Sequence, residues 1–206
     1  NTAVGHNAGL SVTTGVQNTL LGSRTGDALT TGSYNIAIGM DALTTEDTGS
    51  RSVAIGTNAL FNQNYDGDAY NVAIGMSAGS QVTSGIQNTI IGGSAGDAIT
   101  TGSGNVAIGF QALSAEDTHG TNTAIGYRAL KVQDAGANAH NVAVGYNAGV
   151  SVSTGAYNTL LGGLAGDSLT SGAYNVVVGY NALATEDAHG RNIAIGTNAL
   201  TTLDAG

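Results

Sequence analysis

The sequence predicts an all-β fold, a parallel β-solenoid whose twelve coils form a single repeat domain over residues 1–206. A five-residue motif recurs along the whole chain: Asn, any residue, a small apolar residue, an aliphatic residue and Gly. Successive motifs lie 17 residues apart, and every fourth spacing is 19. Coils of this length are too short for a strand–helix unit, and the 3.6-residue helical period is missing. We therefore expect two short strands and two turns in each coil.

The spacings group the coils into three modules, residues 1–70, 71–140 and 141–206, of which we expect the last to be incomplete. The motifs begin at Asn1, Asn18, Asn35, Ser52, Asn71, Asn88, Asn105, Asn122, Asn141, Asn158, Asn175 and Asn192. Stacked coils repeat at ~4.8 Å, so twelve of them predict a rod roughly 55–60 Å long. The leading Asn side chains are expected to stack as an amide ladder that satisfies backbone groups at one corner.

Glycine ends the motif in all twelve coils, which predicts a structural turn at each. The column contains Gly5, Gly22, Gly39, Gly56, Gly75, Gly92, Gly109, Gly126, Gly145, Gly162, Gly179 and Gly196. An invariant Gly indicates either a positive φ or a place with no room for a Cβ atom. Along each strand we expect the aliphatic residues, such as Val53 and Ile55, to enter the core and the Ala between them, Ala54, to face outward.

Two further patterns concern the core and the outward face. Eight residues after the Asn, the first module has Gly9, Gly26, Leu43 and Leu60, and three positions later it has Val12, Leu29, Glu46 and Gln63. Where the first of these two positions is Gly the second is apolar, and where the first is Leu the second is polar. This exchange predicts that both positions share one close-packed core. On the outward face the second coil of each module replaces Ala by a large residue. These residues, Leu20, Ile90 and Leu160, are predicted to lie between chains, near a threefold axis.

Composition excludes several classes of protein. The net charge is −9 with only five Lys and Arg, which argues against nucleic-acid binding. No apolar run is long enough for a membrane helix, and without Cys there is no disulfide or thiolate metal site. Because Asn1 already lies inside a repeat, we expect a longer protein whose targeting segment is elsewhere.

The motif resembles the head repeats of trimeric autotransporter adhesins of the YadA type and the related repeats of phage tail fibres. The resemblance is carried by Asn-x-Ala-Ile-Gly, as at Asn35, Asn71 and Asn122, and it spans the chain. It implies a left-handed parallel β-roll, three chains wound together, and a role in adhesion or as a fibre shaft. Coils of 17 and 19 residues are longer than is usual in those heads, which implies a wider roll or larger corner loops.

Polar residues at the corners give little indication of a catalytic or metal-binding role. The dyads Glu46-Asp47, Glu116-Asp117 and Glu186-Asp187 recur once per module, and a solvated corner loop explains three copies better than an enzyme's single site does. Asp27, Asp97 and Asp167 lack the clustered oxygen ligands that calcium needs. His119 and His189 follow two of the dyads and are interpreted as surface turns. We expect no catalytic residue, metal site or cofactor.

Aromatic residues gather at the coil corners, directly before the Asn or directly after the Gly. They are Tyr34, Tyr70, Tyr157 and Tyr174 before the Asn, and Phe110, Tyr127, Tyr146 and Tyr180 after the Gly. Exposed rings there would stack on a receptor glycan, or would pack between subunits. Thr pairs such as Thr13-Thr14 and Thr30-Thr31 suggest an ice-binding ladder, but Asp47, Asn64 and Asp117 interrupt that column.

Together these features predict a structural or adhesive extracellular fibre on a bacterial surface or a virion, not an enzyme. Its expected partners are further copies of itself, as a homotrimer or longer fibre, and a cell-surface receptor or glycan. The alternative is a monomeric β-solenoid that binds ice, a small ligand or calcium. Oligomeric state separates the two.

Overall fold

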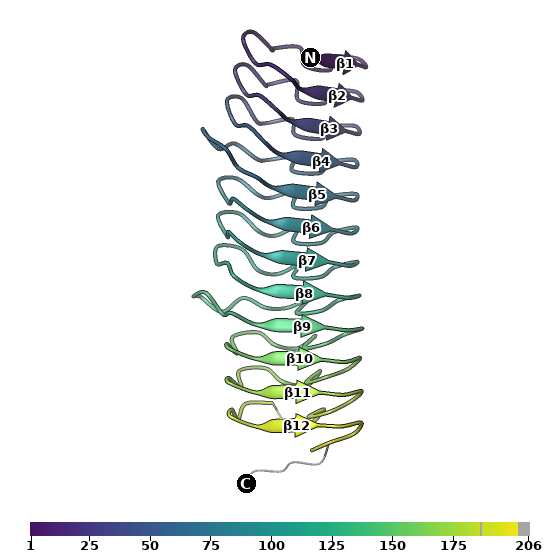
Figure 1. Cartoon of the computed structure of the whole chain (residues 1–206), viewed down its shortest axis with the longest axis vertical. Helices are drawn as coiled ribbons and strands as arrows, with labels where there is room; N and C mark the ends of the chain where they lie inside the picture. The colour runs from purple at the N-terminus through teal and green to yellow at the C-terminus, as the bar shows by residue number, and fades with distance from the viewer. Residues whose placement is uncertain (186, 202–206) are drawn as a thin grey trace.

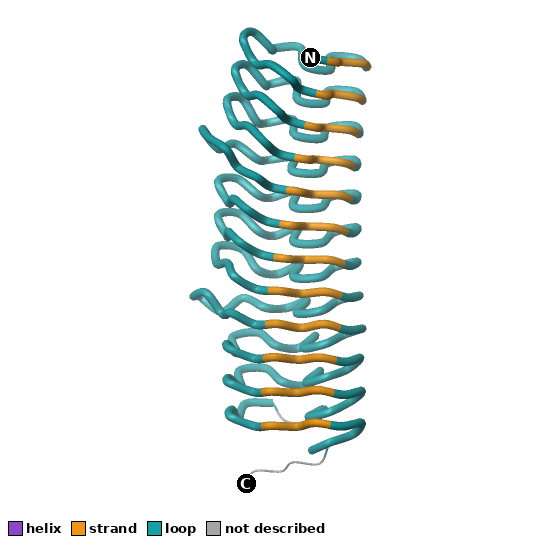
Figure 2. The backbone as a smooth tube through the Cα atoms, in the orientation of Figure 1, coloured by secondary structure: helices purple, strands orange, loops and turns teal. Residues whose placement is uncertain are grey.

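The chain folds as a stack of coils that share one parallel β-sheet (Figures 1 and 2). The structure is a computed structural model that describes residues 1–185 and 187–201. The strands are β1 (Thr2–Val4), β2 (Thr19–Leu21), β3 (Ile36–Ile38), β4 (Val53–Ile55), β5 (Val72–Ile74), β6 (Thr89–Ile91), β7 (Val106–Ile108), β8 (Thr123–Ile125), β9 (Val142–Val144), β10 (Thr159–Leu161), β11 (Val176–Val178) and β12 (Ile193–Ile195). They pair in chain order from β1 to β12, always in parallel, and the motifs stay in register, as in Ala107 opposite Ala124. The predicted all-β solenoid is confirmed.

Each coil contains one strand within the described residues, so the prediction of two strands per coil is wrong. The return segment still bonds to its neighbours through the backbone, as in Gly96 N–H to the carbonyl of Ala112 at 2.9 Å. It is not extended, however, because residues six and eight after the Asn have a left-handed backbone. Asp41 has φ 58° and Leu43 has φ 52°, and their counterparts in other coils repeat this. Two left-handed residues within three positions turn the chain and prevent a β-strand.

The Asn column forms the predicted amide ladder. The Asn88 side chain accepts a bond from the Asn105 backbone N–H at 2.9 Å, and its own Nδ2 donates to the carbonyl of Gly102 at 2.9 Å. The same pair of bonds recurs at Asn18, Asn35 and Asn158. Because these side chains are buried, each bond satisfies a backbone group that would otherwise be left without a partner at the corner.

The Gly column meets both conditions that the sequence suggested. Gly109 has φ +131°, a conformation that side chains disfavour. A Cβ placed on it would lie 2.4 Å from the carbonyl oxygen of Gly126 in the next coil. The column is therefore a line of close contact between successive coils, and it has the geometry expected of the predicted structural turns.

The two faces of the strands are the reverse of the expectation. Ala54 is fully buried, while Val53 and Ile55 on either side of it are partly exposed. The Ala column thus faces the core, and the aliphatic columns face outward. The interior is thin, so a small residue on the strand fits against a large one on the return segment, such as Leu43 or Leu60.

Leu20, Ile90 and Leu160 are therefore not surface residues, and their predicted place between chains is wrong. Their exposed fractions are 1%, 0% and 0%. They point inward into space that glycines leave open. A Cβ on Gly149 would lie 2.6 Å from one methyl of Leu160, and a Cβ on Gly166 would lie 3.0 Å from the other. Each of these large residues thus fills the space left by glycines in two consecutive coils. The exchange of large and small residues that the sequence showed within the core therefore also includes the position two after the Asn.

The 19-residue coils project furthest from the stack, after β4 and after β8 (Figure 1). Their two extra residues enlarge the loop that returns to the next strand and leave the sheet uninterrupted. Within this chain, the 19-residue coils therefore differ from the 17-residue coils in the size of one corner loop. No helix long and apolar enough to cross a membrane occurs in the described ranges.

Candidate functional site

The outward face of the sheet is an uncovered apolar surface. It consists of the residues one and three after each Asn, which are Val, Ile, Leu or Thr in every coil. Ile36 is 39% exposed, Ile74 36% and Val144 36%. A sheet face left to water is normally polar, whereas this one is aliphatic apart from a Thr one after the Asn in five coils. We call it the aliphatic face, and it runs along all twelve strands.

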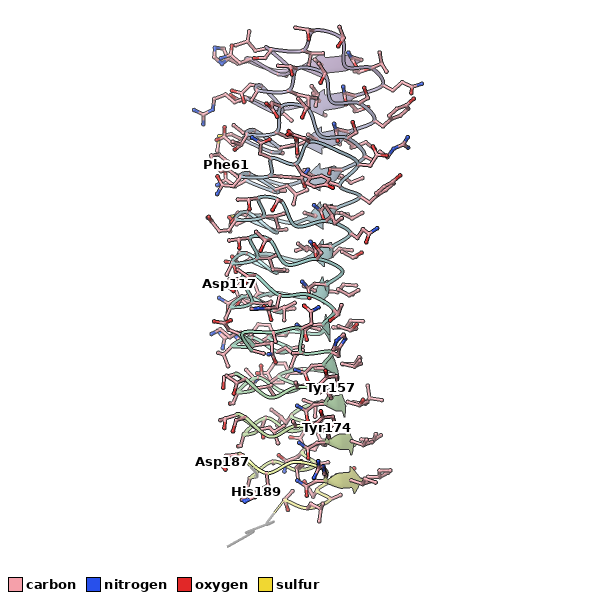
Figure 3. All side chains as sticks on the ribbon, turned by 90° about the vertical axis from the view of Figure 1, so that its left-hand side faces the viewer. Phe61, Asp117, Tyr157, Tyr174, Asp187 and His189 are labelled. Atoms are coloured by element: carbon pink, nitrogen blue, oxygen red, sulfur yellow. The ribbon has the colours of Figure 1, made fainter. Side chains whose placement is uncertain are left out.

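Aromatic side chains border the aliphatic face on both sides. The predicted contact residues Tyr34, Tyr70, Phe110, Tyr127, Tyr146, Tyr157, Tyr174 and Tyr180 are all at least 37% exposed. Those before the Asn lie where the chain enters the strand, and those after the Gly lie where it leaves. In Figure 3, Tyr157 and Tyr174 lie beside the strands. The apolar surface is thus wider than the strands alone.

Many of these rings stack on one another instead of presenting open faces. Tyr157 and Tyr174 have centroids 4.9 Å apart with planes at 7°, and Tyr127 stacks on Tyr146 at 5.3 Å. The Arg51 guanidinium lies over the ring of Tyr34 at 4.9 Å. A ring whose face already contacts a neighbour cannot stack that face on a sugar. The stacked pairs therefore leave fewer ring faces open to a glycan than isolated rings would, and both interpretations of these residues stay predictions.

The corner dyads are not the solvated loops that the sequence suggested. Glu46 and Glu116 have no exposed surface, while Asp47 and Asp117 are partly exposed. Glu186 lies outside the described residues. The Glu46 carboxylate accepts bonds from the Gly49 N–H at 2.7 Å, the Gln63 side chain at 3.0 Å and the Tyr65 N–H at 3.3 Å. The inward direction of Glu46 follows from the packing, since it occupies the slot that Leu29 fills in the preceding coil.

Burial raises the pKa of Glu46, although its bonds from Gln63, Gly49 and Tyr65 oppose the rise. The folded chain therefore holds this proton more tightly than the unfolded chain does. The stability it contributes is fully present below the ordinary Glu pKa of 4.5 and is lost as the pH rises through the raised value. We expect the free energy of unfolding of the native chain to fall relative to that of Glu46→Gln over this range. Urea titrations from acid to neutral pH measure it, and parallel curves would refute the expectation.

A second corner brings together four side chains that could bind a cation. Glu116, Asp117, His119 and Asp134 each offer a ligand atom, and all four atoms lie within 4.8 Å of one another. We call this group the acidic–histidine corner. The His119 ring nitrogen Nδ1 lies 3.6 Å from Glu116 Oε1, and the backbone N–H of His119 donates to the same oxygen at 3.1 Å. Burial, with smaller contributions from the charges of Asp134 and Asp117, raises the pKa of Glu116 to about 7, although the backbone N–H and the charge of His119 oppose the rise.

Sequence reasoning did not assemble this corner, because it considered the Glu-Asp dyads, the histidines and the column that contains Asp117 separately. Asp117 and Asp134 occupy the same position, twelve residues after the Asn, in consecutive coils. Stacking places one over the other beside Glu116 and His119, and combining the columns would have revealed the group. Asp27, Asp97 and Asp167 do not join any such group in the part of the chain that is described. In Figure 3, Asp117, Asp187 and His189 lie on the side of the stack opposite the strands.

The Thr pairs also lie away from the sheet. Thr13, Thr14, Thr30 and Thr31 belong to the irregular return segment, and Thr30 Oγ1 donates to the Asp47 carbonyl at 3.0 Å. They form no flat strand face of the kind the ice-binding alternative requires.

Comparison of the chain with protein-family models, with curated proteins and with solved structures found no match. A function must therefore be inferred from the geometry of the chain itself.

Proposed function

We propose that this chain is a segment of a structural or adhesive extracellular fibre, in which copies pack together through their aliphatic faces. The observation that carries the proposal is the aliphatic face itself. It exposes Val, Ile and Leu side chains in every coil, with Thr beside them in five, where a monomer in water would present mostly polar ones. Contiguous apolar surfaces of this length mark protein–protein interfaces.

Other features support self-association as the use of this surface. The face is straight and strictly periodic, so a second copy can match it coil for coil. Flat aliphatic columns bordered by stacked aromatic rings are typical of an interface core. Three copies around a common axis would cover the face in every chain, which agrees with the trimer that the resemblance to adhesin heads and tail fibres implies. A surface adhesin and a phage tail-fibre shaft, both acting in attachment outside the cell, suit such a rod.

The test is the oligomeric state, measured by light scattering after size-exclusion chromatography. The native chain is expected to form a trimer or a larger assembly. Replacing three outward residues in the variant Ile36→Lys, Ile74→Lys, Val144→Lys should shift it to monomers, because each Lys would bury a charge between chains. A native chain that remains a monomer at all concentrations would contradict the proposal and favour the alternative, a monomeric solenoid that binds a small ligand or ion.

A matched control carries the same three charges away from the aliphatic face, on the return segment. Thr14, Ser84 and Thr154 occupy one position in three modules, and all three are exposed. The variant Thr14→Lys, Ser84→Lys, Thr154→Lys is expected to keep the native oligomeric state. Dissociation of both variants would point to net charge as the cause and away from the aliphatic face.

A further inference from the structure

The acidic–histidine corner offers a mixed set of metal ligands that is independent of the aliphatic face. It contributes one imidazole nitrogen and three carboxylates, with a ligand atom from each within 4.8 Å of all the others. Three of the residues come from the turn of the seventh coil, and Asp134 comes from the eighth. Imidazole together with carboxylates suits first-row divalent ions such as Zn²⁺, whereas Ca²⁺ and Mg²⁺ prefer oxygen ligands alone.

Three carboxylates at this corner face one imidazole, so this group of described residues supplies at most one positive charge against them. Glu116 is fully buried, and the carboxylates of Asp117 and Asp134 lie close to it. The ion pair described there is the one between Glu116 and His119. A buried carboxylate without a matching positive charge is unfavourable, and neighbouring carboxylates increase that cost. A divalent cation among the four side chains would supply the missing charge.

The first module contains the same corner in a form that needs no ion. There Gln63 donates to Glu46 at 3.0 Å, Gly49 stands in place of the histidine and Asn64 in place of Asp134. In the second module, Gln133 instead donates to the Ser153 carbonyl at 3.0 Å. Among the described residues, Glu116 accepts bonds only from the backbone N–H of His119 and from the Asn122 side chain, the latter at 3.3 Å. The turn of the first module therefore forms without counterparts of His119 and Asp134, so the turn itself does not require these two residues.

We infer that the acidic–histidine corner binds one divalent transition-metal ion of the Zn²⁺ type, with Glu116, Asp117, His119 and Asp134 as its ligands. This differs from the sequence-based expectation that His119 belongs to a plain surface turn. The third module repeats the set in sequence as Glu186, Asp187, His189 and Asp204. Glu186 and Asp204 lie outside the described residues, so the inference concerns the second module. An ion there would link two consecutive coils next to the enlarged loop after β8.

The experiment is a Zn²⁺ titration of the metal-free chain by calorimetry, in a His189→Ala background that removes the third-module set. We expect one Zn²⁺ per chain. Asp134→Asn, which copies Asn64 of the first module, and His119→Ala should each lower the affinity by more than the roughly 10–100-fold that loss of an outer-shell partner costs. Asp47→Asn, at the corner without a histidine, should leave the affinity unchanged.

Two results would overturn the inference: no Zn²⁺ binding, or unchanged affinity in both Asp134→Asn and His119→Ala. The second result would assign the ion to other histidines, such as His6 or His140. Circular dichroism of each variant verifies that the coil stack is intact. Since the acidic–histidine corner lies away from the aliphatic face, the titration can refute metal binding without refuting the proposed self-association, and the oligomeric state can refute self-association without refuting metal binding.

Discussion

Gly109→Ala is expected to destabilise the fold by about 4 kcal/mol or more, the range reserved for severe backbone and packing faults. The new Cβ would lie 2.4 Å from the carbonyl oxygen of Gly126, and backbone on both sides cannot move away without separating two coils. The φ of +131° adds strain, because side chains rarely adopt it. Chemical denaturation followed by circular dichroism measures the effect.

Gly104→Ala is the matched control. Gly104 also has a positive φ, +69°, but nothing lies within 4 Å of the position that its Cβ would take. Other coils have Gln87 and Tyr157 at this position with φ of 59°, so side chains are already tolerated there. Its cost should be about 1 kcal/mol, that of a left-handed residue alone. Equal losses in the two variants would mean that the Gly column does not mark a close contact between coils.

Leu160→Ala is expected to cost about 3–5 kcal/mol, as for a large aliphatic side chain removed from a core that cannot collapse. Leu160 fills the space beside Gly149 and Gly166, and both are backbone positions with no side chain to move into the gap. The loss should appear in the unfolding midpoint of dilute samples, where association contributes least.

A compensating substitution tests the reason for this loss. In Leu160→Ala with Gly166→Leu, the coil acquires the pattern of Ala107 with Leu113, where the large residue stands on the return segment. Leu113 has φ 52° and Gly166 has φ 58°, so the backbone already suits the exchange. The double variant should recover part of the lost stability. A further loss instead would show that the two positions do not share one space.

The repeat allowed the corners to be predicted from sequence because few residues can serve there. Gly is the only residue that fits the close approach at Gly109, and Asn alone offers both a donor and an acceptor at the length that the amide ladder needs. These constraints act on single positions, so columns of one residue type indicate them directly.

Which strand residues face the core could not be predicted in the same way. Val53, Ala54 and Ile55 are all apolar, so this strand does not distinguish the two faces, and size suggested the wrong one. A signal was present in other coils, where Thr stands one after the Asn, as at Thr89 and Thr123, while the residue two after it is always apolar. The informative comparison was between positions two and eight after the Asn, where Leu20 is paired with a bare Gly26 and a small Ala37 with Leu43. Burial of Glu46 was missed for a related reason: its partner Gln63 comes from the next coil.

The direction in which the strand residues point is the most consequential feature of the molecule, because it decides whether the aliphatic residues form the core or the contact surface. The chain has no Cys, so single substitutions provide a clean probe. In the variants Val106→Cys, Ala107→Cys and Ile108→Cys, the rate of thiol labelling reports access at three consecutive positions of β7.

We expect the thiol of the Ala107→Cys variant to resist labelling under all native conditions. The thiols of the Val106→Cys and Ile108→Cys variants should react in dilute protein and become protected as the concentration rises and chains associate. Rapid labelling of Ala107→Cys, with protection of the other two variants at every concentration, would place the aliphatic residues in the core and contradict the arrangement described above.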